Sequence, residues 1–151
     1  MLVDISKAAA IDVPQAEAWA LLRDVSRLSA CMPNVSNVEV LEEDRRYAAV
    51  VSDRIGPFAL SLPVNIVVTA IEPPRRITAN LAGDDRRGQA RVRGTLEATA
   101  DAANGSTQLR MAMHVEILGR LATLGAVPIR RRADEVLSEF VQNVSKSVAS
   151  A

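Results

Sequence analysis

Cysteine, histidine, aromatic residues and net charge are all scarce in this chain of 151 residues. The one cysteine, Cys31, cannot form an internal disulfide, which favours a reducing compartment. One cysteine and one histidine, His114, cannot supply a typical zinc site. Eighteen basic side chains balance eighteen acidic ones, and the aromatic residues are one tryptophan, one tyrosine and two phenylalanines. Neither phosphate attraction nor base stacking therefore supports nucleic-acid binding.

Long apolar runs are absent as well. No stretch reaches the roughly 18 consecutive apolar residues of a membrane-spanning helix. The first residues, MLVDISKAAA, lack a basic start followed by a long apolar run, so we expect no secretory signal. A chain of this length buries roughly 70% of its unfolded surface and needs no metal or disulfide to fold. We therefore expect one domain over residues 1–151, cytoplasmic, with membrane association through its surface left open.

The chain begins with a strand pattern followed by two short helical patterns. Apolar and polar residues alternate loosely over residues 2–12, which predicts a strand. In DVPQAEAWALLRD, Asp12 can cap a helix and Pro14 can occupy its first turn. A second helical stretch, DVSRLSACM, is expected to stop before Pro33, because the residue before a proline disfavours helical backbone.

The period of the apolar pattern changes to two over residues 34–118, which predicts about six strands. The links between them are short and fall at residues 42–46, 56–57, 72–76, 83–88 and 101–106. Links of hairpin length connect antiparallel neighbours. Pro63 lacks an N–H group for a ladder, so its strand is expected to lie at a sheet edge or to carry a bulge.

The longest helical pattern is LGRLATLGAVPIRRRADEVLSEFVQNV, residues 118–144, with apolar residues at spacings of three and four. Its first half holds two glycines and Pro128, which weaken a helix by ~1 and ~3 kcal/mol each relative to alanine. We expect Pro128 to kink the helix or to begin its regular part, and we expect bending or opening in the first half. A helix of about 25 residues is ~38 Å long, enough to cross a sheet. The element order predicts an α+β fold, in which a curved antiparallel sheet of about seven strands wraps around this helix.

Small residues face this helix from the predicted strands, among them Ala79, Ala90, Gly94 and Ala98. Because a tightly packed interior needs volume, this deficit favours an apolar cavity that would suit a hydrophobic guest. The alternative is that the apolar stripe of the helix is ordinary core. From the periodicity, the expected ligand-binding residues are Leu60, Leu62, Val64, Val92, Met111, Met113, Leu121, Leu124 and Phe140.

The order of elements resembles the helix-grip fold of the START-like, polyketide cyclase and Bet v 1 superfamily (SRPBCC). The segment VPQAEAWALLRDVSRLSACMPNV is similar to the N-terminal signature of the CoxG family of carbon monoxide dehydrogenase subunits. The residues that fit this signature are Val13, Pro14, Trp19, Leu28, Cys31 and Pro33. The stretches IGP, EPPRRI, LATLG and ADEVLSEFVQNV fit its later motifs. Asn34 stands where the family usually has glycine, and we expect it to tolerate the same left-handed backbone.

The resemblance implies a non-catalytic accessory protein without a cofactor, which binds a hydrophobic ligand, a quinone or a lipid, in an internal cavity. Members of the family look like helpers of molybdenum hydroxylases such as carbon monoxide dehydrogenase, acting by membrane recruitment or quinone delivery. Arg130, Arg131 and Arg132 are candidates for a peripheral contact with acidic lipid headgroups or with an acidic partner. The alternative is a solvated helix face paired with Asp134 and Glu135. A monomer and a homodimer are both compatible with the sequence.

Two other functions remain open. A polyketide cyclase/dehydrase-like enzyme would need polar side chains inside the cavity. The inward positions offer only Tyr47 and Thr78 as candidates, so we assign no catalytic residue. A buried arginine, aspartate or histidine that points inward would favour the enzyme. A ligand-free docking module would instead have a filled interior and an exposed apolar patch.

Three further residues have structural interpretations. Cys31 is expected to be a small buried hydrophobe before a turn. His114 alternates with Met113 and Val115, so it is expected on the outer, solvated face of its strand. Trp19 is expected to anchor the first helix to the sheet, with a place at the edge of the cavity as the alternative.

Overall fold

The computed structural model describes residues 1–149, which form seven strands, three α-helices and one 3₁₀ helix. In chain order the elements are β1 (Leu2–Ile11), α1 (Gln15–Arg23), α2 (Val25–Ala30), β2 (Val35–Glu42), β3 (Arg46–Ile55), β4 (Phe58–Glu72), β5 (Arg76–Asp84), β6 (Arg91–Ala103), β7 (Ser106–Leu118), η1 (Arg120–Leu124) and α3 (Ala126–Ala149). This order confirms the predicted α+β fold, with two short helices after the first strand and a long helix at the end.

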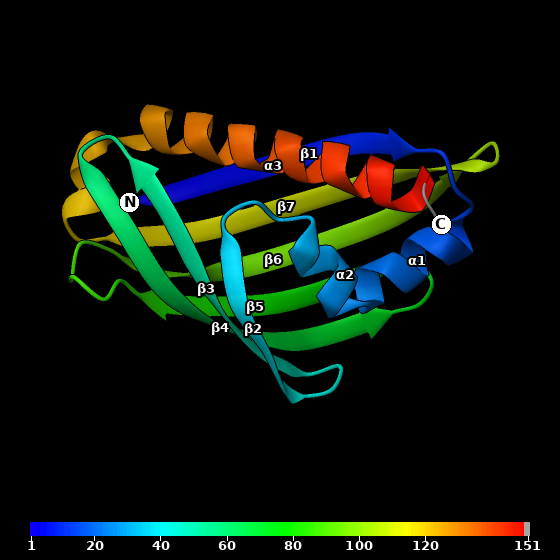
Figure 1. Ribbon diagram of the computed structural model, residues 1–151, viewed down its shortest axis with the longest axis horizontal. Helices are drawn as coiled ribbons and strands as arrows, with labels where there is room; N and C mark the ends of the chain where they lie inside the picture. Colours follow the sequence, from blue (N-terminus) through cyan, green and yellow to red (C-terminus); the bar gives the residue numbers. More distant parts are fainter. Residues whose placement is uncertain (150–151) are drawn as a thin grey trace.

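All strands join one antiparallel sheet in the order β1-β7-β6-β5-β4-β3-β2. The chain runs from β2 to β7 through hairpins only, and β1 is added beside β7, so β1 and β2 form the two edges. The sheet curves, and α3 lies along β1 on its concave side (Figure 1). We call this concave side the inner face. Helices α1 and α2 cover the same face near the end of α3 (Figure 1).

The turns between strands fall where the sequence places them. Asn104 and Gly105 link β6 to β7 with positive φ values of 50° and 87°, the backbone of a two-residue type I′ hairpin. Asp44 also has a positive φ, 61°, within the predicted link between β2 and β3. These residue types tolerate left-handed backbone better than others do.

The prediction for Pro63 is confirmed in part, because β4 is not an edge strand but does carry a bulge. β4 is an interior strand between β3 and β5, and its register shift falls between Val68 and Ala70. Pro63 is paired with Val50 of β3, whereas the ladder between β4 and β5 begins one residue later, at Val64. The proline therefore lies where the pairing with β5 has ended, and no bond of that ladder is lost there.

The predicted helical stretch over residues 118–144 is divided in the structure. Leu118 ends β7, η1 follows, and Gly125 with φ 79° precedes α3, which begins at Ala126. Pro128 lies in the first turn of α3, where backbone N–H groups have no helical partner in any case. Of the two expectations for Pro128, the structure bears out a start of the regular helix and shows no kink there.

Two separate clusters of buried apolar side chains form the core. The cluster around η1, the η1 cluster, consists of Val3, Ala49, Leu60, Leu62, Val64, Ala90, Val92, Val115, Ile117, Leu121 and Ile129. The cluster around α1, the α1 cluster, consists of Ile11, Val13, Ala18, Leu21, Leu22, Cys31, Ala100, Leu109, Phe140 and Val144. They occupy opposite ends of the inner face, so the middle of that face belongs to neither cluster of buried residues.

Candidate ligand-binding site

Strand register places a band of apolar side chains in the middle of the inner face. Leu96 of β6 is opposite Ala79 on one side and Met113 on the other, and Met111 is opposite Ala98. Side chains opposite one another in an antiparallel pair share a face. The band consists of Ile66, Leu81, Leu96, Ala98, Met111 and Met113, all partly exposed. The apolar side chains of the inner face are therefore buried at its two ends and partly exposed in its middle.

The nine predicted ligand-binding residues divide between the ends and this band. Buried in the η1 cluster are Leu60, Leu62, Val64, Val92 and Leu121. Leu124 and Met113 pack against that cluster while partly exposed, Met111 packs in the same way against the α1 cluster, and Phe140 is fully buried within it. Leu121 and Leu124 belong to η1 and not to the long helix. Only the two methionines border the partly exposed middle.

Three apolar members of the band were missed from the sequence. Ile66, Leu81 and Leu96 face inward with the same alternation that identifies their neighbours on β4, β5 and β6. The alternation of apolar residues with a period of two therefore already indicated that these side chains face inward. The choice among inward positions needs strand register, which the sequence alone does not provide.

Asp53 of β3 is a polar group on the inner face that was missed from the sequence. It is opposite Leu60 of the η1 cluster, and its carboxylate is only 10% exposed. Arg132 Nε of α3 lies 3.0 and 3.1 Å from its two oxygens, and Asn34 Nδ2 donates to Oδ2 at 3.2 Å. The Arg54 N–H also donates to Asp53. Because each oxygen already accepts from the protein, Asp53 ties α3 to β3 and is not a free base.

Arg132 is fixed by a second carboxylate. Its Nη1 donates to Glu135 at 3.0 Å, and the hydrogen bonds to Glu135 and then to Asp53 raise the pKa of Arg132 above its ordinary value. The neighbouring Arg130 and Arg131 are exposed. Of the three arginines considered for a membrane contact, Arg132 is thus paired with two carboxylates of the protein itself.

Asn34 tolerates left-handed backbone but does not adopt it in the structure. Positive φ among non-glycine residues 1–149 is confined to Asn37, Asp44 and Asn104. The Asn34 side chain instead bonds to Asp53, a contact that glycine could not make. The departure from the family pattern thus adds a side-chain contact between the α2–β2 loop and β3.

Lys7 is a second polar residue on the inner face. It is opposite Met111, and its Nζ lies 3.1 Å from Asp134 Oδ1 on α3. The two polar candidates from the sequence are placed differently. The Tyr47 hydroxyl is buried and accepts from the Asp44 N–H at 2.9 Å, and Thr78, opposite Glu97, lies on the outer face. The expectation that Thr78 faces inward was wrong.

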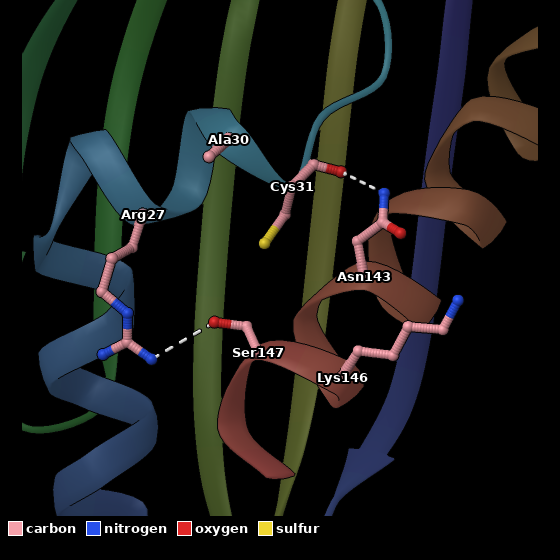
Figure 2. A pocket seen from close by; sticks show the side chains of 6 residues that line it. All are labelled: Arg27, Ala30, Cys31, Asn143, Lys146 and Ser147. Carbon is pink, nitrogen blue, oxygen red and sulfur yellow. Dashed lines mark hydrogen bonds between the residues drawn. The ribbon is translucent and has the colours of Figure 1, made fainter. Parts of the chain in front are cut away.

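A hollow of about 520 Å³ lies between α2 and the last turns of α3. Its lining residues are Arg27, Ala30, Cys31, Asn143, Lys146 and Ser147. Figure 2 shows the Cys31 thiol pointing into the space between the two helices. Asn143 Nδ2 donates to the Cys31 carbonyl at 2.9 Å, and Arg27 Nη2 donates to Ser147 Oγ at 3.4 Å (Figure 2). None of the nine predicted residues lines this hollow.

The structural interpretations of three other residues agree with their observed positions. Cys31 is 6% exposed, and burial raises the pKa of its thiol, with partial opposition from the Arg27 charge. His114 is exposed on the outer face, with Nδ1 2.7 Å from Asp4 Oδ1. Trp19 is partly buried and packs against the α1 cluster.

The curved sheet around a C-terminal helix is shared with solved structures. A conserved protein from Geobacillus kaustophilus has a TM-score of 0.86 and 24% identity, with 97% of this chain and 95% of that chain covered. A START superfamily protein from Mycobacterium smegmatis has a TM-score of 0.77 and 14% identity, with 97% of each chain covered. The Zhui aromatase/cyclase from Streptomyces sp. R1128 has a TM-score of 0.62 and 16% identity, with 98% and 92% covered. The protein thus has the START-like, helix-grip fold.

Within this fold class the sequence is specific enough to assign a family. The family model for the carbon monoxide dehydrogenase subunit CoxG matches residues 8–149, nearly the whole chain, and the protein belongs to that family. No protein of curated function matches the sequence. Among residues 1–149, no helix has the length and hydropathy needed to cross a bilayer.

Proposed function

We propose that this protein is a non-catalytic accessory protein that binds a hydrophobic ligand, a quinone or a lipid, between its sheet and α3. The observation that carries the proposal is the band of partly exposed apolar side chains between the η1 and α1 clusters. Covering this band with a ligand removes apolar surface from water, at about 25 cal/mol per Å². The nine residues predicted from the sequence are proposed as its surroundings, with Met111 and Met113 in direct contact.

A carrier role fits the chemistry of such ligands. Each buried CH₂ group of an isoprenoid or acyl tail contributes ~0.8 kcal/mol, so the tail does not leave a membrane unaided. Met111 and Met113 are adaptable wall residues, because their unbranched thioether side chains fill irregular space. Membership of the CoxG family makes a molybdenum hydroxylase, such as carbon monoxide dehydrogenase, the proposed partner.

Membrane recruitment is proposed to involve Arg130 and Arg131 in preference to Arg132. Both are exposed at the start of α3, next to Val127, which is 64% exposed. Each basic side chain near an anionic membrane contributes ~1 kcal/mol, so two arginines alone give weak, salt-sensitive binding. The contact would bring the carrier to its ligand without anchoring it.

One observation supports the alternative that the protein is an enzyme. Asp53 and Arg132 are the kind of inner-face polar groups that a cyclase-like reaction would need, and an aromatase/cyclase shares the fold. Their mutual hydrogen bonds, together with those from Asn34 and Glu135, leave neither group directed at a substrate. We therefore favour binding without catalysis.

The first test is mass spectrometry of an organic extract of the purified protein after incubation with native membranes. A stoichiometric quinone or lipid is expected. A matched pair of variants then locates it: Ala98→Leu fills the band beside Met111, whereas Ala82→Leu adds the same atoms on the exposed outer face. Binding of decylubiquinone should weaken at least about tenfold in the first variant only. A clean extract, with Ala98→Leu strongly destabilised by overpacking, would favour a filled interior and the docking module.

A further inference from the structure

Helix α2 is weakly packed for an element that covers the inner face. None of its six residues is buried. One hollow of about 520 Å³ separates it from α3, and another of about 290 Å³ lies beside it, lined by residues of α1, α2 and β2 that include Arg23 and Val40. Close packing restricts the movement of a helix, and α2 has a hollow on each of two sides in place of close-packed neighbours. It therefore has room to move on both.

The segment over residues 25–34, α2 with the loop to β2, is attached by a small number of hydrogen bonds and by the packing of Leu28, Cys31 and Met32 on the α1 cluster. We call it the cover segment. Its side-chain hydrogen bonds with α3 include the Asn143 amide on the Cys31 carbonyl and the longer bond from Arg27 to Ser147 (Figure 2). At its far end Asn34 is fixed to β3, through its side chain on Asp53 and through its carbonyl, which accepts from the Ser52 N–H at 2.9 Å.

The cover segment is also able to move as a unit. The Asp24 carboxylate caps α2 by accepting from the Arg27 N–H, so the helix keeps its first turn without help from the sheet. Asp24 itself has extended backbone between α1 and α2. Opening about a hinge at Asp24, with the fixed point at Asn34, breaks the hydrogen bonds to α3 and the apolar packing of the segment on the α1 cluster.

We infer that the cover segment is the gate of the inner face, and that its release from Asn143 and Ser147 of α3 opens the passage for a hydrophobic ligand. The inner side of the gate consists of Leu28, Cys31 and Met32, which pack with the α1 cluster. Met111 of the central band packs against the same cluster, so lifting the segment uncovers apolar surface that is contiguous with the band. The ligand part of this inference rests on the proposed function, whereas the opening itself does not.

Cys31 offers a native reporter of this opening. It is the single cysteine, it lies in the cover segment, and it is buried when the gate is closed. Because the thiol is only 6% exposed at the wall of the hollow, its rate of reaction with a bulky, chromogenic aryl disulfide increases with the population of open molecules. Asn143→Ala removes one tether without altering the charge near the thiol. Arg27→Ala is less suitable, because the Arg27 charge lowers the pKa of this thiol and its loss would slow the reaction itself.

Labelling is expected to be about fivefold faster in Asn143→Ala, the size of effect that follows loss of one neutral hydrogen bond. Gln142→Ala, at the exposed neighbouring position on α3, is the matched control and should label like the unmodified protein. The labelling rate should also be nearly independent of urea at low concentration, because local opening exposes little surface. Equal rates in Asn143→Ala and Gln142→Ala, or a steep urea dependence that tracks global unfolding, would overturn the gate.

The ligand arm uses decylubiquinone and the fluorescence of Trp19, the single tryptophan, which packs beside the α1 cluster. Release of quinone into lipid vesicles should be faster in Asn143→Ala by the same factor as labelling, with Kd nearly unchanged. Faster labelling with unchanged release would show that the segment opens but is not the passage. Absence of any quinone binding would remove the ligand role and count against the quinone form of the proposed function, while labelling still decides the opening.

Discussion

The two ends of the inner face are closed by different means. At one end η1 packs between the β3–β4 turn and the β5–β6 link. The Leu121 N–H donates to the Gln89 carbonyl at 3.0 Å, and a side chain added at Gly56 would meet Leu124 at 3.3 Å. Leu121 itself is 3% exposed. Backbone bonds and buried apolar contacts together make this end a fixed wall.

The other end is closed by the cover segment, in which no residue of α2 is buried and Cys31, just after it, is. Side-chain hydrogen bonds from Asn143 and to Ser147 join it to α3, and hollows flank it. Free energies of local opening are lowest where few apolar contacts are buried. The comparison therefore places the movable part of the protein at α2.

This placement differs from the expectation based on glycine and proline near the start of the last helix. Gly125 and Pro128 do interrupt the helical pattern, and the chain changes direction there. Local propensity describes the isolated backbone, however, and burial of Leu121 stabilises the same segment through tertiary contacts. Flexible residue types indicated where a helix begins, whereas the opening that we propose lies at the cover segment.

The largest effect that separates the two ends is expected from paired leucine truncations. Leu121→Ala removes a buried side chain from the fixed end and should reduce the free energy of unfolding by about 2–5 kcal/mol. Leu28→Ala removes a partly exposed side chain from the cover segment and should cost only about 1 kcal/mol. Urea unfolding followed by circular dichroism measures both. Equal losses would mean that the two ends are equally well packed.

A pH-dependent contribution is expected at the fixed end from Asp85. Burial alone would raise the pKa of its carboxyl, but the N–H groups of Ser61, Gln89 and Arg87 outweigh burial and hold this pKa below its ordinary value. A folded pKa below the unfolded value, about 3.9, means that the stabilisation is complete above that pH. It is lost as the pH falls through the folded value.

Asp85→Ala should therefore cost at least about 2 kcal/mol at neutral pH, and the difference from the unmodified protein should shrink in acid below about pH 4. Asp84→Ala is the matched control, because the Asp84 carboxylate is 70% exposed and pairs with Arg91 at the surface. The measurement is urea unfolding at a series of pH values. A cost that stays constant from neutral to strongly acidic solution would contradict a role for the ionised carboxylate.

The fold followed from the sequence because its signals are local and repeated. Period-two alternation and turn residues such as Asn104-Gly105 specify hairpins between neighbouring strands. A chain of hairpins followed by a long amphipathic helix has few compact arrangements. Pro63 did not reveal that β4 is an interior strand, because strand order is a long-range property.

The candidate site was predictable only in its chemical character. Alternation identified inward apolar positions, but most of the chosen residues, such as Leu62, lie in the η1 cluster and not in the central band. Asp53, Arg132 and Lys7 reach the inner face from three different elements. A charged residue in an alternating strand looks solvent-facing until its partner on a distant helix is known.

A smaller effect is expected from the ion pair that links α3 to β3. Arg132→Ala leaves the poorly exposed Asp53 carboxylate without its cation, which should cost about 1–3 kcal/mol. The value is reduced from that of a fully buried pair, because Arg132 is 37% exposed and water screens the interaction. Arg131→Ala, one position away and exposed, should lie within about 0.5 kcal/mol of the unmodified protein. Thermal unfolding of the two variants compares them directly, and similar losses would show that Asp53 is adequately solvated without Arg132.

The smallest effect is expected from Lys7, and it tests which element moves. Lys7→Met keeps the aliphatic length beside Met111 and removes the ion pair with Asp134, whose carboxylate is 62% exposed. Such a pair contributes at most about 1 kcal/mol, and less in high salt. Because α3 should stay on β1 while the cover segment lifts, labelling of Cys31 should not change in this variant. Faster labelling in Lys7→Met would instead assign the motion to α3, since loosening the helix on its β1 side would then be enough to uncover the thiol.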